Sequence, residues 1–333
     1  MSVVPKPATP FSPQEFIRAR ARWQPLEMVF WLSTLLPFVV VPEYLQLASQ
    51  IAISALFAIS LDLILGYAGI VSIGHAAYFG LGAYTAGILS KHGIGEPLVL
   101  LALGAVVAGI VGYATSFIIA RFRHLALIMI TLGICLMLFE AANLAGWLTG
   151  GADGLQGMKI GPLLGTFRFD MYGKTAYGYS LLVLFLCFLV ARRLTHSAFG
   201  LSLRGIRENA VRMPAIGAPS DAHIRKVYTI AAVLAGIAGA VLAQTTSTVS
   251  LEVLGFQRSA DVLVMLILGG AGRLYGGVLG SIVYMVARDQ FSGINPQYWY
   301  FWIGLMMVLV VMYLPRGLLG GLEKIAFHWR GKP

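Results

Sequence analysis

The chain has 333 residues, of which 58% are hydrophobic and only 11% charged, and its formal net charge is +10. A soluble domain carries about 25% charged residues, so this composition excludes an ordinary water-soluble globular protein. The apolar residues form long runs typical of membrane-spanning helices, without the alternation of a β-barrel, and the basic residues lie between these runs, which argues against a nucleic-acid-binding surface.

The first apolar run follows a polar, basic segment. Residues 1–25 contain Arg18, Arg20 and Arg22, which predicts a cytoplasmic N-terminal tail. Residues 26–41 then form the first predicted span, with a kink at Pro37. Further spans are predicted at 47–65, 73–89, 98–120, 125–144, 179–190 with its flanks, and 227–243. The stretch 146–178 is predicted to be a periplasmic loop, and the basic segment 191–226 a cytoplasmic one.

The last third of the chain is interrupted by glycines. Residues 259–287 are predicted to form two short helices around 269–277, and residues 298–314 form the last span. The fold class is therefore all-α, a polytopic transmembrane bundle of about ten helices, some short or broken. The transmembrane domain covers 26–317, and the basic tail 318–333 places both termini in the cytoplasm.

The glycine-rich segment 66–84 is the first candidate for function. Small residues let membrane helices pack closely, and a broken backbone at membrane depth is tolerated where it lines a wet cavity. Helix packing alone and the wall or gate of a translocation path are both open interpretations. His75 fits a hydrogen-bonded packing residue better than a proton relay. The candidate path residues are Gly66, Gly69, Ser72, Gly74, His75, Tyr78 and Gly80.

The basic segment 197–217 is the second candidate. It mixes apolar residues with Arg204, Arg207, Glu208 and Arg212, so a short amphipathic helix could dock on a soluble partner or lie on the membrane. The third candidate, 268–280, lacks the lysine of a phosphate loop and predicts a flexible turn between two helices. That turn contains Gly269, Gly270, Gly272 and Arg273.

Catalytic and metal-binding patterns are not evident in the sequence. Cys135 and Cys187 lie inside apolar runs, so neither a disulfide nor a metal site is predicted. The chain has no ATP-binding motif, so energy for uphill transport comes from a partner or from an ion gradient. An ion-coupled secondary transporter and a structural or enzymatic membrane subunit are the alternatives.

Five motifs occur in a characteristic order: 66–84, 147–154, Arg207-Glu-Asn209, 269–280 and Pro315-Arg-Gly317. In this order the chain resembles, from about residue 47 to 320, the permease subunits of branched-chain amino-acid ABC importers. The resemblance implies a multi-pass protein of the bacterial inner membrane that pairs with a second, related permease. It further implies two cytoplasmic ATPase subunits that use ATP and Mg²⁺, a periplasmic substrate-binding protein, and no cofactor bound by this chain.

The resemblance also assigns residues to roles. It implies that Arg207, Glu208, Asn209 and Gly217 contact the ATPase, with Arg204 in the same coupling loop. The run 210–214 departs from the family pattern, and Pro214 is expected to shorten the coupling helix. The expected substrate is a branched-chain or related amino acid, while urea and aromatic acids, which relatives carry, are alternatives.

Overall fold

The structure is a computed structural model that describes residues 25–122, 125–165, 167, 169–170, 173–314 and 316–321. The described chain is helical, and its only β-type pairings are isolated bridges between Leu155 and Val249 and between Leu163 and Phe167. The predicted all-α class is therefore confirmed for these residues. The principal helices are α2 (Pro25–Ser33), α3 (Pro37–Val40), α4 (Leu45–Asp62), α5 (Ala76–Lys91), α6 (Pro97–Ile119), α7 (Leu125–Leu144), α9 (Lys174–Thr195), α10 (Ala198–Asn209), α12 (Ser220–Thr246), α13 (Phe256–Gly269), α14 (Leu274–Ile294) and α15 (Trp299–Tyr313).

Six helical segments of the described chain are long and apolar enough to cross a membrane, or up to seven if the bent pair α13–α14 counts as one span. The number of about ten crossings is therefore not confirmed. The difference arises where helices are short or bent. The run 26–41 is divided into α2 and α3, α5 has only 16 residues, and α13 and α14 meet at an angle of 113°.

The helix boundaries follow the expected breaking residues. Pro37 begins α3, because its ring cannot continue the hydrogen bonding of the preceding helix. Gly173, with φ +74°, precedes α9, so the predicted loop 146–178 ends before residue 174. In the same way the predicted loop 191–226 loses its first residues to α9 and its last ones to α12, which begins at Ser220.

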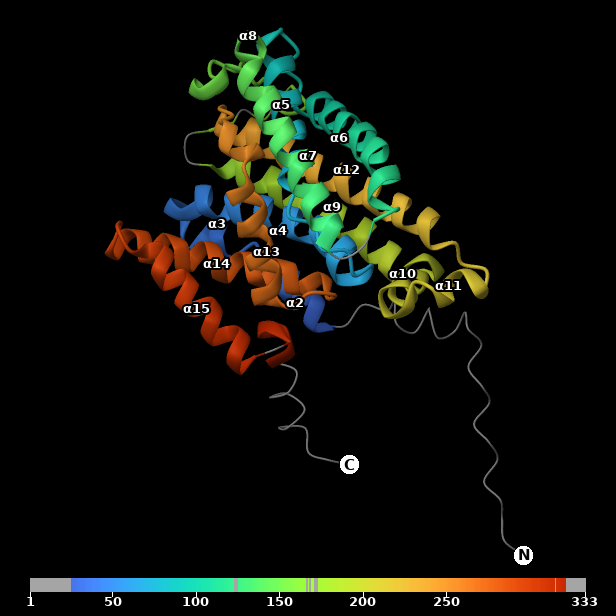
Figure 1. Ribbon diagram of the computed structural model, residues 1–333. Coiled ribbons are helices and arrows are strands. Elements are labelled where there is room, and N and C mark those ends of the chain that lie inside the picture. The colour runs from blue at the N-terminus through green and yellow to red at the C-terminus, as the bar shows by residue number, and fades with distance from the viewer. Residues whose placement is uncertain are drawn as a thin grey trace, which may run out of the picture.

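The core lies around α4 and α12, the most deeply buried of the long helices, whereas α7 and α15 are largely exposed. Figure 1 shows α7 in front of α12, and α14 and α15 at one side of the bundle. The backbones of α5 and α12 touch: a Cβ on Gly82 would overlap the carbonyl of Gly236, and one on Gly239 the carbonyl of Phe79. Such small residues allow close helix contact where a hydrophobic driving force is weak.

Candidate functional site

Helix α10 is a short amphipathic helix outside the long spans, and it lies beside α11 (Arg212–Ala215) at one end of the bundle (Figure 1). Its first turn is capped by Ser197, whose hydroxyl accepts a hydrogen bond from the Gly200 amide at 3.4 Å. Leu203 and Ile206 are buried, three residues apart on one face. The apolar face therefore fixes α10 against the bundle.

Arg207 links α10 to the end of α4. Its guanidinium Nη1 donates a hydrogen bond to the carbonyl oxygen of Gly66. Gly69 has φ +73°, and a Cβ there would lie 2.8 Å from Arg207 Cγ. A glycine is thus required both by the left-handed backbone and by the side chain that crosses it. The break between the second and third predicted spans is real, because Leu63–Tyr67 forms a π-helical turn that ends α4.

Asp62 extends the same connection to the turn between α13 and α14. Its side chain is fully buried, and Oδ1 accepts a hydrogen bond from the Gly272 amide at 2.6 Å. A Cβ on Gly66 would overlap both Asp62 Oδ1 and the Gly272 nitrogen. We call this set the α10 junction; it consists of Asp62, Gly66, Gly69, Arg207 and Gly272.

Two arginines of α10 provide the positive charge near the buried carboxylate. Arg204 and Arg207 both lie close enough to interact electrostatically with Asp62. The Arg204 guanidinium also lies 5.2 Å from the ring centroid of Tyr67, a cation–π arrangement. A buried carboxylate is costly unless charges or donors compensate it, so α10 stabilises the end of α4 as well as contacting it.

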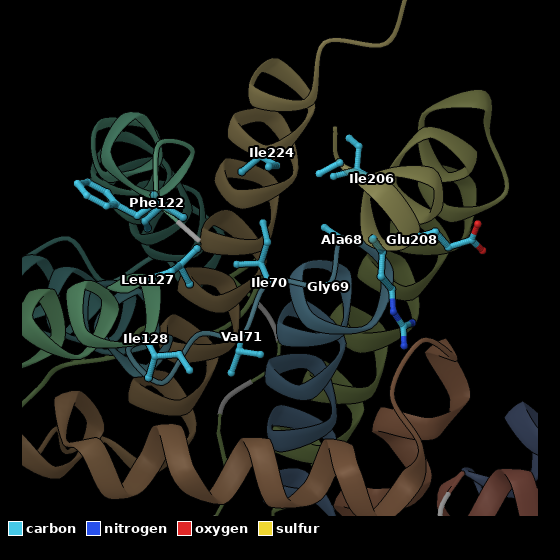
Figure 2. A pocket seen from close by; sticks show the side chains of 13 residues that line it. Ala68, Gly69, Ile70, Val71, Phe122, Leu127, Ile128, Ile206, Glu208 and Ile224 are labelled. Atoms are coloured by element: carbon cyan, nitrogen blue, oxygen red, sulfur yellow. The ribbon is translucent and has the colours of Figure 1, made fainter. Parts of the chain in front are cut away.

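A cavity of about 350 Å³ lies beside the junction, between the 68–71 loop, α10 and the first turns of α7 and α12. Figure 2 shows Ile70, Val71 and Leu127 facing this space, whereas the Glu208 carboxylate points away from them. Glu208 is exposed. The C-terminal end of α10 therefore presents an acidic side chain outward, while the apolar face of the helix packs on the bundle.

Asn209 has a structural role that the sequence did not indicate. Its Oδ1 accepts hydrogen bonds from the amides of Val211 and Arg212, each at 3.1 Å, and so begins α11. Helix α10 ends at Asn209, and Pro214 lies inside α11. Pro214 is thus not the residue that ends α10. The helix ends earlier, at Asn209, whose side chain accepts hydrogen bonds from the next backbone amides. Gly217, with φ +84° and nothing within 4 Å of its Cβ position, lies in the turn before α12.

The remaining residues of the candidate path are packed inside the bundle. His75 Nε2 lies 2.9 Å from Ser60 Oγ, and its ring stacks on Phe57 at an interplanar angle of 5°. The hydroxyl of Tyr78 lies 2.7 Å from Thr115 Oγ1 and donates to the Tyr228 hydroxyl at 3.1 Å. These contacts agree with the predicted packing and hydrogen-bonding role of His75.

The glycines of the same segment contact neighbouring helices. A Cβ on Gly74 would overlap the Thr131 carbonyl of α7, and one on Gly80 would overlap Leu254. Ser72 is fully buried. The structure supports helix packing for Gly74 and Gly80, whereas a role as a path wall or gate stays a prediction for all seven residues.

The helix break lies within the predicted turn but is shorter than the expected 269–277, because Gly276 and Gly277 belong to α14, which with 21 residues is not a short helix. Helix α13 ends at Gly269 and α14 begins at Leu274, and Gly270 and Gly272 have φ values of +110° and +84°. Arg273 stands immediately before α14. The three segments singled out in the sequence therefore meet at one place, the α10 junction.

Sequence reasoning missed the two bonds that join these segments. Asp62 was recognisable as an ionisable residue in an apolar run, which usually has a partner, but its partner lies 210 residues away. The partner of Arg207 lies 141 residues away and is a backbone carbonyl. Every residue has such a carbonyl, so the sequence does not indicate which one Arg207 binds. Among the described residues, no group of three or more His, Cys, Asp or Glu could hold a metal ion.

Comparison with known proteins shows the family to which the chain belongs. Residues 44–311 match the family described as "Branched-chain amino acid transport system / permease component". The chain is 26% identical over 309 residues to the high-affinity branched-chain amino acid transport system permease protein LivM of Salmonella typhimurium, covering 85% of this chain and 71% of that protein. It is 23% identical to LivH of the same organism, covering 80% and 91%, and 24% identical to a probable LivM of Methanocaldococcus jannaschii, covering 79% and 89%. No solved structure matches the chain.

Proposed function

This chain belongs to the family of permease components of branched-chain amino acid transport systems, and from that membership we propose how it works as an importer subunit. It is a transport permease of an ABC importer and carries branched-chain or related amino acids. The observation that carries the proposal is the α10 junction. There α10 is hydrogen-bonded through Arg207 to the backbone at the end of α4, and Asp62 of α4 is hydrogen-bonded to the turn between α13 and α14.

The proposed role of α10 is to receive force from a separate ATPase subunit. Glu208 and Asn209 are exposed at the C-terminal end of an amphipathic helix, a form that fits a groove on a soluble partner. A displacement of α10 would reach α4 through Arg207 and the α13–α14 turn through Asp62. ATP and Mg²⁺ would be bound by two cytoplasmic ATPase subunits and not by this chain.

The proposal includes a second permease and a substrate-binding protein. The relatives include both LivM and LivH, which supports a pair of related permeases. Helices α7 and α15 expose apolar surface to lipid or to that second permease. On the opposite side from α10, Trp147 is 86% exposed in the short helix α8 (Gly146–Thr149) and would contact the periplasmic binding protein.

We further propose that the protein lies in the bacterial inner membrane with both termini in the cytoplasm. The support is the positive-inside rule, because Arg192, Arg193, Arg204, Arg207 and Arg212 all lie at the α10 end of the bundle. The basic tails 1–24 and 322–333 lie outside the described residues.

Affinity purification of the tagged chain from its native membranes, with mass spectrometry of the bound proteins, tests the proposed assembly. We expect two ATPase subunits and one related permease to be recovered with it. Recovery of the chain alone, from a preparation in which another known membrane complex stays intact, would contradict the proposal and favour an ion-coupled transporter.

The substitution Glu208→Arg tests the proposed role of α10. It reverses an exposed charge without touching the buried face of the helix, so the protein should insert and assemble normally. We expect uptake to fall roughly tenfold while ATP hydrolysis continues, because a docking contact of opposite charge becomes repulsive. The matched control is Glu43→Arg, an exposed acidic residue in the segment before α4. Equal uptake in both variants would refute the assignment of Glu208.

A further inference from the structure

A second cavity lies far from the α10 junction, at the other end of α13. Its volume is about 500 Å³, and its walls come from α7, the end of α12, the segment Leu251–Leu254, α13, α14 and the start of α15. Helix α13 joins the two regions, because Phe256 at its start lines this cavity and Gly269 at its end precedes the turn that binds Asp62. We call this space the charged cavity.

Four charged residues line the charged cavity, two of each sign: Arg258, Arg288, Glu252 and Asp261. They lie close enough for the three others to interact electrostatically with Arg258. Yet in the part of the chain that the structure describes, neither guanidinium forms an ion pair within 4.0 Å of a carboxylate. The two pairs of charges therefore face a common space without neutralising each other by contact.

Neutral groups hold three of these charges in place. The Arg258 guanidinium lies 5.3 Å from the ring centroid of Phe79, and that of Arg288 lies 5.1 Å from the ring centroid of Trp299. Asp261 Oδ1 accepts hydrogen bonds from the Tyr284 hydroxyl at 2.9 Å and from the Gln257 amide at 3.1 Å. Aromatic and amide partners orient a charge without cancelling it, so each charge remains able to bind an ionic ligand.

Apolar residues form much of the remaining wall, which also includes the polar residues Ser250, Gln257 and Tyr300. Leu136 and Phe139 of α7, Leu242 of α12 and Val253 line the cavity beside the charged residues. Its volume falls in the range of about 300–1,000 Å³ that is usual for small-molecule sites, which are mostly apolar with a few placed polar groups. The cavity thus combines an aliphatic wall, guanidinium groups and carboxylates.

We propose that the charged cavity binds an α-amino acid as a zwitterion with an aliphatic side chain. Arg258 and Arg288 take the carboxylate, for which a guanidinium offers paired donors. Asp261 and Glu252 take the ammonium group, and the alkyl chain contacts Leu136, Leu242 and Val253. This inference rests on the proposed function and extends it, because it assigns a site for the substrate inside the permease itself.

The pairing of charges selects among ligands. A zwitterion satisfies both signs, whereas a carboxylic acid without an ammonium group leaves Asp261 and Glu252 unmatched. Urea is neutral and satisfies neither pair. The charged cavity therefore favours amino acids over the urea and aromatic acids that the sequence left open as substrates.

Saturation-transfer NMR on the complete complex in nanodiscs, without the binding protein, tests the site. The probes are leucine, 4-methylpentanoate, which lacks the ammonium group, and 3-methylbutylamine, which lacks the carboxylate. We expect leucine to bind and each analogue to bind about tenfold more weakly or worse, because each loses a charge-assisted hydrogen bond. No leucine binding, or equal binding of the three probes, would overturn the proposal.

Two variants connect the binding to named residues. Arg258→Gln and Asp261→Asn should each weaken leucine binding by about tenfold. In Asp261→Asn, removal of the ligand's ammonium group should then cost less than in the wild type, because only the contact with Glu252 is left to lose. The control is Asp153→Asn, an exposed carboxylate in the loop after α7, which should bind leucine like the wild type. Unchanged leucine binding in Asp261→Asn would overturn the site even if Arg258→Gln fails to assemble.

Leucine uptake by the wild-type complex, supplied with its binding protein, separates this inference from the proposed function. If the wild-type complex takes up leucine and the variants lose leucine binding, both the proposed function and this inference are supported. Uptake by a complex whose charged cavity does not bind leucine overturns this inference alone. Failure of the wild type to take up any amino acid overturns the proposed function, and the site assignment with it.

Discussion

The α10 junction and the charged cavity lie at opposite ends of α13, and they differ in packing. At the junction the backbones of Gly66 and Gly272 are so close that a single added methyl group would overlap its neighbours. The charged cavity has a volume of about 500 Å³. Among the described residues, the charged side chains that line it form no ion pair with one another. The close packing of the first arrangement fits the proposed transmission of a displacement, while the second has room for a ligand. One helix thus connects a rigid contact to a space that can be filled.

Gly66→Ala tests the rigid end and should have the largest effect. Its Cβ would overlap Asp62 Oδ1 and the Gly272 nitrogen, so the junction must open, at a cost of about 3 kcal/mol in the free energy of unfolding. The measurement is thermal stability of the purified protein in detergent. Gly133→Ala on α7 is the matched control, because nothing lies within 4 Å of its Cβ position and alanine favours a helix. Equal melting temperatures in the two variants would show that the junction is loosely packed.

Asp62→Ala should have the next largest effect. It leaves the Gly272 amide without its acceptor and removes the charge that faces Arg204 and Arg207, which costs about 2 kcal/mol. Asp62→Asn retains an acceptor oxygen and should recover part of the lost stability. The same thermal assay, combined with uptake, measures both variants. If Ala and Asn were equally stable, the bond to Gly272 would contribute nothing.

Asn209→Ala should have the smallest effect. It removes the acceptor for the amides of Val211 and Arg212, so the first turn of α11 frays at a cost of about 1 kcal/mol. Asn209→Asp keeps an acceptor and should restore the turn. Hydrogen exchange of residues 211–215 measures the effect, which should leave α4 and the charged cavity protected. Exchange that spreads to α4 would mean that α11 supports the whole junction.

The sequence predicted the local features of this fold well because they depend on neighbouring residues. The apolar run 125–144 became α7 with the same bounds, and Gly270 and Gly272 lie in the turn between α13 and α14. It did not predict which segments meet. The approach of Asp62 to Gly272 depends on the packing of distant helices, which hydrophobicity does not encode.

The charged cavity shows the same limit. In the sequence, Asp261 is a single acidic residue at the start of the segment 259–287, with nothing beside it that indicates a site. The structure adds Arg258 from the same helix, Arg288 from α14 and an aliphatic wall from α7 and α12. Residues from at least four elements form this site, and no spacing along the chain brings them together.

The source of energy for uptake separates an ATP-driven importer from an ion-coupled transporter. The purified complex would be reconstituted in proteoliposomes with leucine and its binding protein on the outer side, and either ATP inside or an imposed proton or sodium gradient. We expect uptake to require ATP and to stop when the ATPase subunits are inactivated by substitution. Uptake driven by an ion gradient, with this chain alone and without ATP, would contradict it.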